Sequence, residues 1–134
     1  MKTIIRLFTS CEGKLLSVLR IFSGLLMMQH GGQKVLGFPG ASKMPFDLFS
    51  KIGFAGLLEL ILGLTLAIGL FTRTSAFILS GLMAVAYFTV HAPKDFFPMI
   101  NGGELAVLYC FVYLYLAAAG GGELSVDRLR GGKK

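Results

Sequence analysis

Ionisable side chains occur at a few positions inside or at the ends of long apolar segments, where such groups are rare. His30 and Lys34 lie four residues apart, Glu59 falls within the next apolar segment, and His91 and Glu104 lie at the ends of two more. An ionisable group inside a bilayer costs about 2.5 to 3.5 kcal/mol, so it is expected to face protein or enclosed water. Imidazole and carboxylate groups carry protons, and an ammonium group donates hydrogen bonds to a polar ligand. These residue types predict a polar site that transfers protons or binds a ligand.

Helical periodicity predicts that the polar residues of each segment share one face. At about 100° per residue, one arc of the first segment carries Arg20, Ser23, Met27, His30 and Lys34. On the second segment Glu59 shares a face with Gly56 and Gly63, and small residues let a neighbouring helix approach closely. The third segment carries its own small and polar face, which ends at His91. We therefore expect these faces to point into the protein.

Two interpretations of Arg20 and Glu59 remain open. Glu59 lies about 10 Å below the outer start of its segment, and Arg20 lies deeper on the neighbouring helix. The guanidinium group of Arg20 could therefore reach up to the Glu59 carboxylate. In the alternative, Arg20 extends to the inner membrane interface and Glu59 is a neutral, hydrogen-bonded packing residue.

Asn101 and Glu104 open the last apolar segment, and they also allow two interpretations. Asn101 can serve as the N-cap of a helix in which Glu104 is the third residue, an arrangement that resembles a capping box and suits the helix dipole. Alternatively, both residues complete one outward-facing pocket. The other members of that pocket are His30, Lys34, His91, Glu59 at its floor and Arg20 below the floor.

Four apolar segments must position these side chains: residues 15–32, 52–71, 74–90 and 103–119. At about 1.5 Å per residue, each can cross a hydrocarbon core of about 30 Å. Hydrophobic residues make up 54% of the 134 residues and charged residues only 15%, so four buried soluble helices would have no polar exterior around them. We predict an all-α fold, a four-helix transmembrane bundle that forms a single membrane domain over residues 1–134.

The basic residues favour an orientation in a membrane over binding to nucleic acid. The chain carries 13 Lys and Arg residues against 7 Asp and Glu. Eight of the basic residues lie at the two ends or in the turn between the second and third segments: Lys2, Arg6, Lys14, Arg73, Arg128, Arg130, Lys133 and Lys134. If these eight are cytoplasmic, the basic residues left outside are Lys34, Lys43, Lys51 and Lys94, and Arg20 lies within the membrane and is not counted. The sequence therefore predicts a multi-pass protein with both termini in the cytoplasm.

Taken in order, these motifs are similar to those of the DoxX family of small four-helix membrane proteins. The resemblance covers residues 15–129 and rests on the stretch 24–38 (GLLMMQHGGQKVLGF), Glu59, Thr72-Arg73, His91, 101–105 (NGGEL) and 124–127 (LSVD). It implies a protein of the cytoplasmic membrane of a bacterium or archaeon that acts as an oxidoreductase or beside redox enzymes. Relatives in the family include a subunit of thiosulfate:quinone oxidoreductase. The positions that match the family's polar motif are His30, Lys34, Glu59, His91, Asn101 and Glu104.

Three functions fit these residues. The first is a quinone-linked oxidoreductase, or an accessory subunit of a membrane redox complex, in which the catalytic residues are Glu59, His30 and His91. The ligand-binding residues are then Lys34, Asn101, Glu104 and Arg20. The second is a module that binds or transports a small polar solute, and the third is a metal or haem site ligated by His30 and His91.

The first function requires partners, because the chain itself carries no evident redox group. It has no dithiol, no G-x-G-x-x-G motif and no set of iron–sulfur cysteines. Electrons would therefore come through a bound cofactor, for which a quinone is the candidate, or from a partner enzyme. The expected partners are the lipid bilayer and a redox-enzyme subunit, and a second copy of the chain is a further candidate.

Overall fold

The computed structural model describes residues 1–40 and 45–131, and this part of the chain is all-α without a strand. Its helices are α1 (Lys2–Ser10), α2 (Glu12–Leu36), α3 (Lys51–Ile68), α4 (Thr72–Ala86), the π-helical turn η1 (Tyr87–His91), α5 (Pro98–Asn101), α6 (Glu104–Ala119) and α7 (Val126–Leu129). The predicted all-α fold class is confirmed. Of the basic residues in the predicted charge pattern, Lys43, Lys133 and Lys134 lie outside the described residues.

The four predicted segments correspond to α2, α3, α4 with η1, and α6. α2 extends to Leu36, four residues beyond the predicted boundary, and α3 stops at Ile68, three residues before its predicted boundary. Gly69 follows with a φ of 74°, a left-handed conformation that glycine adopts without a steric cost and that ends a helix. The chain then turns directly into α4.

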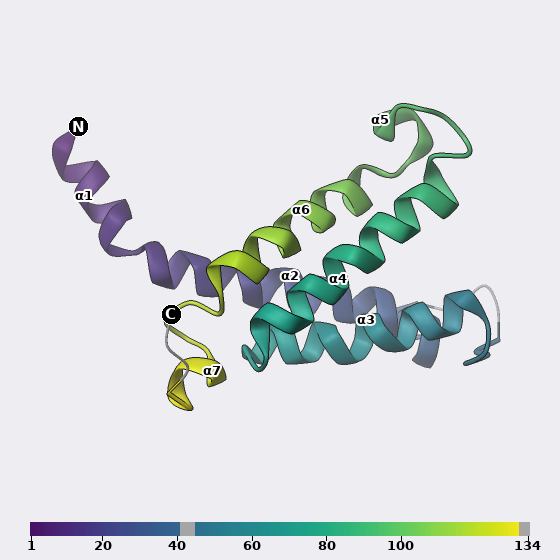
Figure 1. Cartoon of the computed structure of the whole chain (residues 1–134), viewed down its shortest axis with the longest axis horizontal. Coiled ribbons are helices and arrows are strands. Elements are labelled where there is room, and N and C mark those ends of the chain that lie inside the picture. The colour runs from purple at the N-terminus through teal and green to yellow at the C-terminus, as the bar shows by residue number, and fades with distance from the viewer. Residues whose placement is uncertain (41–44, 132–134) are drawn as a thin grey trace.

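The long helices are arranged as two antiparallel pairs (Figure 1). α2 packs along α3, α4 packs along α6, and α3 and α4 join the pairs at the end where the chain turns between them. From that end the pairs diverge, so that α5 and the start of α6 lie well apart from the start of α3 (Figure 1). The end of α2 therefore belongs to one arm, formed by α2 and α3. The end of η1 belongs to the other arm, formed by α4, η1, α5 and α6.

Glycines allow α2 and α3 to approach backbone to backbone. A Cβ atom on Gly24 would lie 2.8 Å from the carbonyl oxygen of Gly63, and one on Gly31 would lie 2.6 Å from that of Gly56. Both distances are too short for any side chain, and they repeat at seven-residue intervals on each helix. The expectation that Gly56 and Gly63 pack closely against another helix is confirmed.

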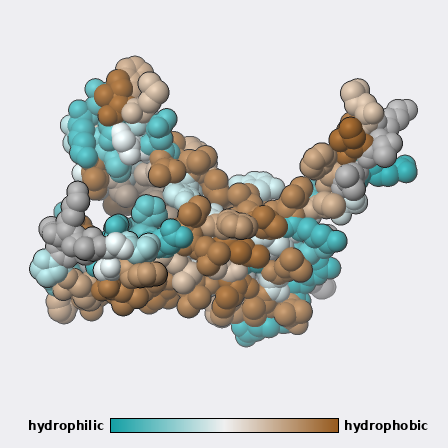
Figure 2. All heavy atoms as spheres, turned by 180° about the vertical axis from the view of Figure 1, so that it is seen from behind, coloured by the Kyte–Doolittle hydropathy of each residue, from teal (hydrophilic) through white to brown (hydrophobic). Residues whose placement is uncertain are grey.

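The apolar core is small, and most large apolar side chains lie on the outside. The core consists of Met27, Leu66, Ala76, Leu79, Met83, Tyr113 and Leu116. Figure 2 shows one face, on which hydrophobic residues occupy the middle and hydrophilic residues gather toward the ends. Such a contiguous apolar exterior is typical of a surface that contacts lipid or another protein.

Two helices of the described chain are long and apolar enough to cross a membrane. They are α3, with 18 residues, and the continuous run Thr72–His91, with 20 residues. α6 is equally apolar in character but has 16 residues, and α2 carries Arg20 and Lys34 within its length. The spanning of all four segments is therefore part of the proposal below.

Candidate functional site

The buried carboxylate of Glu59 on α3 forms an ion pair with Lys34 on α2. The Lys34 ammonium nitrogen lies 2.6 Å from Oε1 and 2.7 Å from Oε2. The Glu59 side chain is 4% exposed and that of Lys34 31%, so the carboxylate is enclosed while its partner reaches the surface. Gly56, one turn before Glu59, makes room for the pair, because a Cβ there would lie 2.7 Å from Lys34 Cβ.

An aromatic group lies beside the ion pair, where α6 contacts α2. The His30 ring, one turn before Lys34, meets the Tyr109 ring edge-on at 6.5 Å between centroids. Tyr109 stacks on Tyr113 at 5.5 Å, and the Tyr113 hydroxyl donates to the carbonyl of Ser23 at 2.9 Å. Within residues 1–40 and 45–131, the His30 ring and the Tyr109 hydroxyl make no hydrogen bond, so both remain available to a ligand.

Arg20 does not approach Glu59, and the expectation that the two groups pair is wrong. Its guanidinium group, which is fully buried, donates four hydrogen bonds of 2.5 to 2.8 Å to the carbonyls of Leu66, Ala67, Gly121 and Leu124. Carbonyls in the last turn of a helix lack partners within the helix, and Arg20 donates to two of those in α3. The alternative fails as well, because Arg20 is enclosed by protein and Glu59 is ion-paired.

His91 and Asn101 organise the loop between η1 and α6. The His91 Nδ1 atom lies 3.2 Å from the Asn101 carbonyl oxygen. The buried Asn101 amide donates to the carbonyl of Asp95 at 2.9 Å, and its Oδ1 accepts from the Gly103 N–H at 2.7 Å. Each of these bonds is to the backbone, so the polar groups hold the loop in shape.

Glu104 is the first residue of α6, not the third, and the predicted capping box is wrong. Asn101 belongs to the short helix α5, and Gly103 is the N-cap of α6. Glu104 is exposed and makes no hydrogen bond among the described residues. Its carboxylate still lies in the first turn, where the helix dipole favours negative charge.

The residues of the expected outward-facing pocket are therefore divided between the two arms. His30, Lys34 and Glu59 lie on α2 and α3, whereas His91, Asn101 and Glu104 lie on η1, α5 and α6. The arms diverge toward the ends of α2 and η1, where these residues lie (Figure 1). The described residues include no hydrogen bond, ion pair or ring contact that joins the two sets. Only the first set includes a buried ionisable pair.

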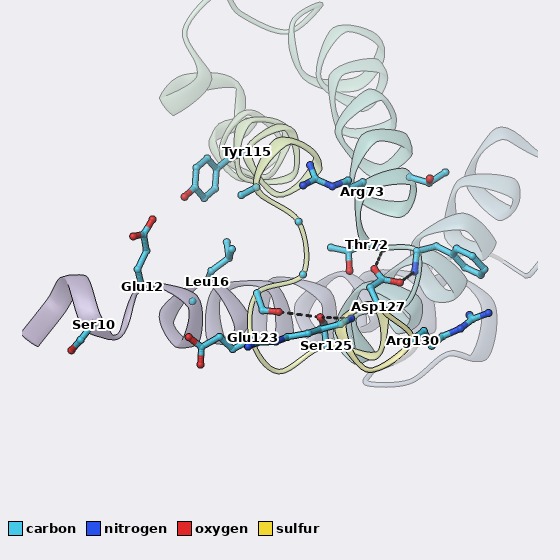
Figure 3. Close-up of a pocket in the computed structure, with 18 of the residues that line it drawn as sticks. Ser10, Glu12, Leu16, Thr72, Arg73, Tyr115, Glu123, Ser125, Asp127 and Arg130 are labelled. Carbon is cyan, nitrogen blue, oxygen red and sulfur yellow. Dashed lines mark hydrogen bonds between the residues drawn. The ribbon is translucent and has the colours of Figure 1, made fainter. Parts of the chain in front are cut away.

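A cavity of about 850 Å³ lies at the opposite end of the protein (Figure 3). It lies between the starts of α2 and α4 and the segment after α6, and its charged residues are Glu12, Arg73, Glu123, Asp127, Arg128 and Arg130. Two of these hold helix ends. Arg73 donates to the carbonyls of Ala117 and Ala118 at the end of α6, and the Asp127 carboxylate accepts from the Phe71 and Thr72 N–H groups at 2.8 Å.

The pKa of Asp127 reflects this capping role. Burial opposes its ionisation, but the hydrogen bonds from Thr72 and Phe71, together with the charge of Arg130, outweigh burial. The pKa of Asp127 therefore lies below its ordinary value. Ionised Asp127 stabilises the start of α4.

Sequence reasoning missed two parts of this arrangement. Tyr109 and Tyr113 lie four residues apart in the last apolar segment, and this spacing was the signal that α6 carries an aromatic face. The stretch 124–127 was noted only for its family resemblance, and its contacts with Arg20 and α4 depend on the fold. No group of three or more His, Cys, Asp or Glu residues in the described chain lies close enough to hold a metal ion.

Comparisons with known proteins agree with the resemblance in the motifs. The DoxX family model matches residues 15–92. An uncharacterized protein of Haemophilus influenzae is 41% identical over 122 residues, which cover 84% of this chain and 87% of that protein. A second uncharacterized protein of the same organism is 38% identical over 71 residues, covering 53% of this chain and 47% of that protein. No solved structure matches the chain significantly.

Proposed function

Because the chain belongs to the DoxX family, we propose that it is an integral protein of a prokaryotic cytoplasmic membrane with a role in quinone-linked redox chemistry. It serves either as an oxidoreductase or as the accessory subunit of a membrane redox complex. In this proposal α2, α3, α4 with η1, and α6 all cross the bilayer, and both termini are cytoplasmic. The ligand-binding part is the set His30, Lys34 and Glu59, extended by Tyr109.

Arg20 and Lys34 on α2 are compatible with a membrane span, because each charge has partners within the protein. Arg20 is enclosed by four carbonyl groups, and Lys34 is paired with Glu59. A paired and hydrogen-bonded charge avoids most of the penalty that an isolated charge incurs in hydrocarbon. α6 is about 24 Å long at 16 residues, and local thinning of the bilayer accommodates such a short helix.

The observation that carries the proposal is the buried Lys34–Glu59 ion pair beside two unused hydrogen-bonding groups. A quinone head group needs donors to its carbonyl oxygens and a route for protons. His30 and the Tyr109 hydroxyl are free to donate, and their rings meet edge-on, so an aromatic head group can contact both. The residues present therefore fit a quinone.

The proposed reaction assigns separate roles to the protein and to a partner. Reduction of a quinone to a quinol consumes two electrons and two protons. The electrons come from a partner redox enzyme, because Cys11 and Cys110 are separate free thiols. His30 would supply one of the two protons to a quinone oxygen and the second would come from solvent, while Lys34, paired with Glu59, would donate a hydrogen bond to the same oxygen.

Binding of a short-chain benzoquinone to the purified protein in mild detergent tests this proposal, with isothermal titration calorimetry as the readout. We expect His30→Gln and Tyr109→Phe each to raise the Kd about 5- to 10-fold, the effect of losing one hydrogen bond. His91→Gln is the matched control, because the His91 ring is bonded to the Asn101 carbonyl in the loop before α6, and it should leave the Kd unchanged. A wild-type protein that binds no quinone, or an equal effect of all three substitutions, would contradict the proposed site.

Native mass spectrometry of the wild-type protein, purified from membranes in mild detergent, tests the accessory role separately. We expect a redox-enzyme subunit to copurify. A protein that binds quinone but copurifies with no such subunit would favour the independent oxidoreductase, and a protein that does neither would exclude both roles.

A further inference from the structure

The N-terminal helix α1 stands apart from the helix pairs and leaves its apolar side chains uncovered. The chain changes direction at Cys11, and α1 projects away from α2 (Figure 1). Ile4, Ile5 and Phe8 are 59 to 61% exposed. Three large exposed apolar side chains on a nine-residue helix require a partner.

The apolar and polar residues of α1 lie on opposite faces. At 100° per residue, Ile4, Ile5 and Phe8 fall within an arc of about 100°, and Arg6 and Ser10 fall on the other side. The stretch 2–10 contains two basic residues and no acidic residue. An apolar face opposite a basic face is the pattern of a helix that lies in the plane of a membrane surface.

The apolar face of α1 continues onto the exterior of the long helices. An open groove of about 520 Å³ runs from α1 to α2 and α6, and its lining is mostly apolar, with Phe8, Leu15 and Leu19 beside the polar Thr9 and Glu12. Leu15 and Leu19 lie on the first proposed span, where the surrounding medium is lipid. The same medium therefore reaches Phe8.

We propose that α1 is an in-plane anchor that binds the surface of an anionic lipid leaflet. Ile4, Ile5 and Phe8 insert at the boundary between head groups and acyl chains, Arg6 contacts lipid phosphates, and the charge of Lys2 adds to the attraction. A lipid surface fits better than a protein partner, because the groove joins α1 to the lipid-facing side of α2 and the charge of α1 is complementary to anionic lipid. This inference rests on the membrane assignment and is independent of quinone binding.

A single tryptophan can report the depth of α1, because the natural chain contains none. We would place it at Phe8→Trp on the apolar face and, as the matched control, at Ser10→Trp on the opposite face. Each protein is reconstituted in vesicles of phosphatidylcholine with about 30% phosphatidylglycerol. Lipids brominated at shallow or deep acyl positions then quench the fluorescence.

We expect the emission of Phe8→Trp to be blue-shifted and quenched most strongly by the shallow bromines, and that of Ser10→Trp to resemble water-exposed tryptophan. Emission of Phe8→Trp at the water-exposed wavelength overturns the proposal, as does blue-shifted emission without quenching by lipid, which would mean a protein cover. Strongest quenching by deep bromines also overturns it, because α1 would then extend the span. Flotation of the wild-type vesicles tests the membrane assignment by itself.

The contribution of the charges is tested by adding Lys2→Gln and Arg6→Gln to the Phe8→Trp protein. Each basic residue near an anionic surface favours the docked state about fivefold, so the double substitution should lower the ratio of docked to undocked α1 about 30-fold at low ionic strength. Replacing phosphatidylglycerol with phosphatidylcholine should reproduce the loss. Blue-shifted, lipid-quenched emission that is insensitive to both changes would refute the role of anionic lipid.

Discussion

Adding one methyl group at Gly31 tests the close approach of α2 and α3. A Cβ atom at this position would lie 2.4 Å from the backbone nitrogen of Leu60 and 2.6 Å from the carbonyl oxygen of Gly56. Ordinary van der Waals contact begins at 3.4 Å, so the gap to Leu60 is about 1 Å too small. Both contacts are with backbone atoms of a helix, so no side chain can rotate away to relieve them.

The expected cost follows from the displacement that Gly31→Ala imposes. α3 must move away from α2 by a large part of the missing 1 Å, and a gap of 0.5 to 1 Å already loses about a quarter to a half of the dispersion energy of each contact. Overpacking of this kind typically costs about 1 to 3 kcal/mol. Alanine also favours a helix over glycine by about 1 kcal/mol, which partly offsets the cost and must be removed by a control.

Gly81→Ala is that control, because Gly81 is also helical but no atom lies within 4 Å of its added Cβ. The two variants share the gain in helix propensity, so the difference between their free energies of unfolding isolates the effect of packing. We expect Gly31→Ala to be less stable than Gly81→Ala by about 1 to 3 kcal/mol, measured by denaturant unfolding in mild detergent with circular dichroism. Equal stabilities would refute the backbone contact and remove the basis for the Lys34–Glu59 geometry.

Three further predictions concern the buried and capping charges. Arg20→Met should destabilise the fold by about 3 kcal/mol or more, because four carbonyls lose the guanidinium donor. Hydrogen exchange should accelerate in residues 120–127, and unchanged protection there would contradict the role of Arg20 in holding this segment. Lys34→Met should destabilise by about 1 to 3 kcal/mol by leaving the Glu59 carboxylate buried without a partner, and adding Glu59→Gln should recover most of the loss in denaturant unfolding. The pKa of Asp127 is lowered in the folded protein, so ionised Asp127 adds to the free energy of unfolding. This contribution should be complete above about pH 4 and disappear as the pH falls through the folded pKa. Asp127→Asn should remove that part of the pH dependence of Tm, and an identical acid-side profile for the wild type and Asp127→Asn would count against the cap.

The long helices and their close-packing faces could be predicted from the sequence, because both are properties of single segments. Apolar composition determines which stretches are helical and buried in lipid or protein, and a period of about 3.6 residues determines which side chains share a face. The seven-residue spacing of Gly56 and Gly63 marked one such face before any partner was known. Helix ends were less predictable, since Gly69 and the short α5 helix act through local backbone conformation.

Only the tertiary structure decided which charges meet. Several polar residues of the first segment share one face, so periodicity allowed either Arg20 or Lys34 to face Glu59. The antiparallel register of α2 and α3 sets Gly31 against Gly56, which places Lys34 beside Glu59 and carries Arg20 to the far end of α3. In the same way, equal depth suggested that His30 and His91 share a pocket, but the divergence of the two helix pairs puts them on separate arms. Register and inter-helix angle depend on contacts between segments, and no pattern within one segment encodes them.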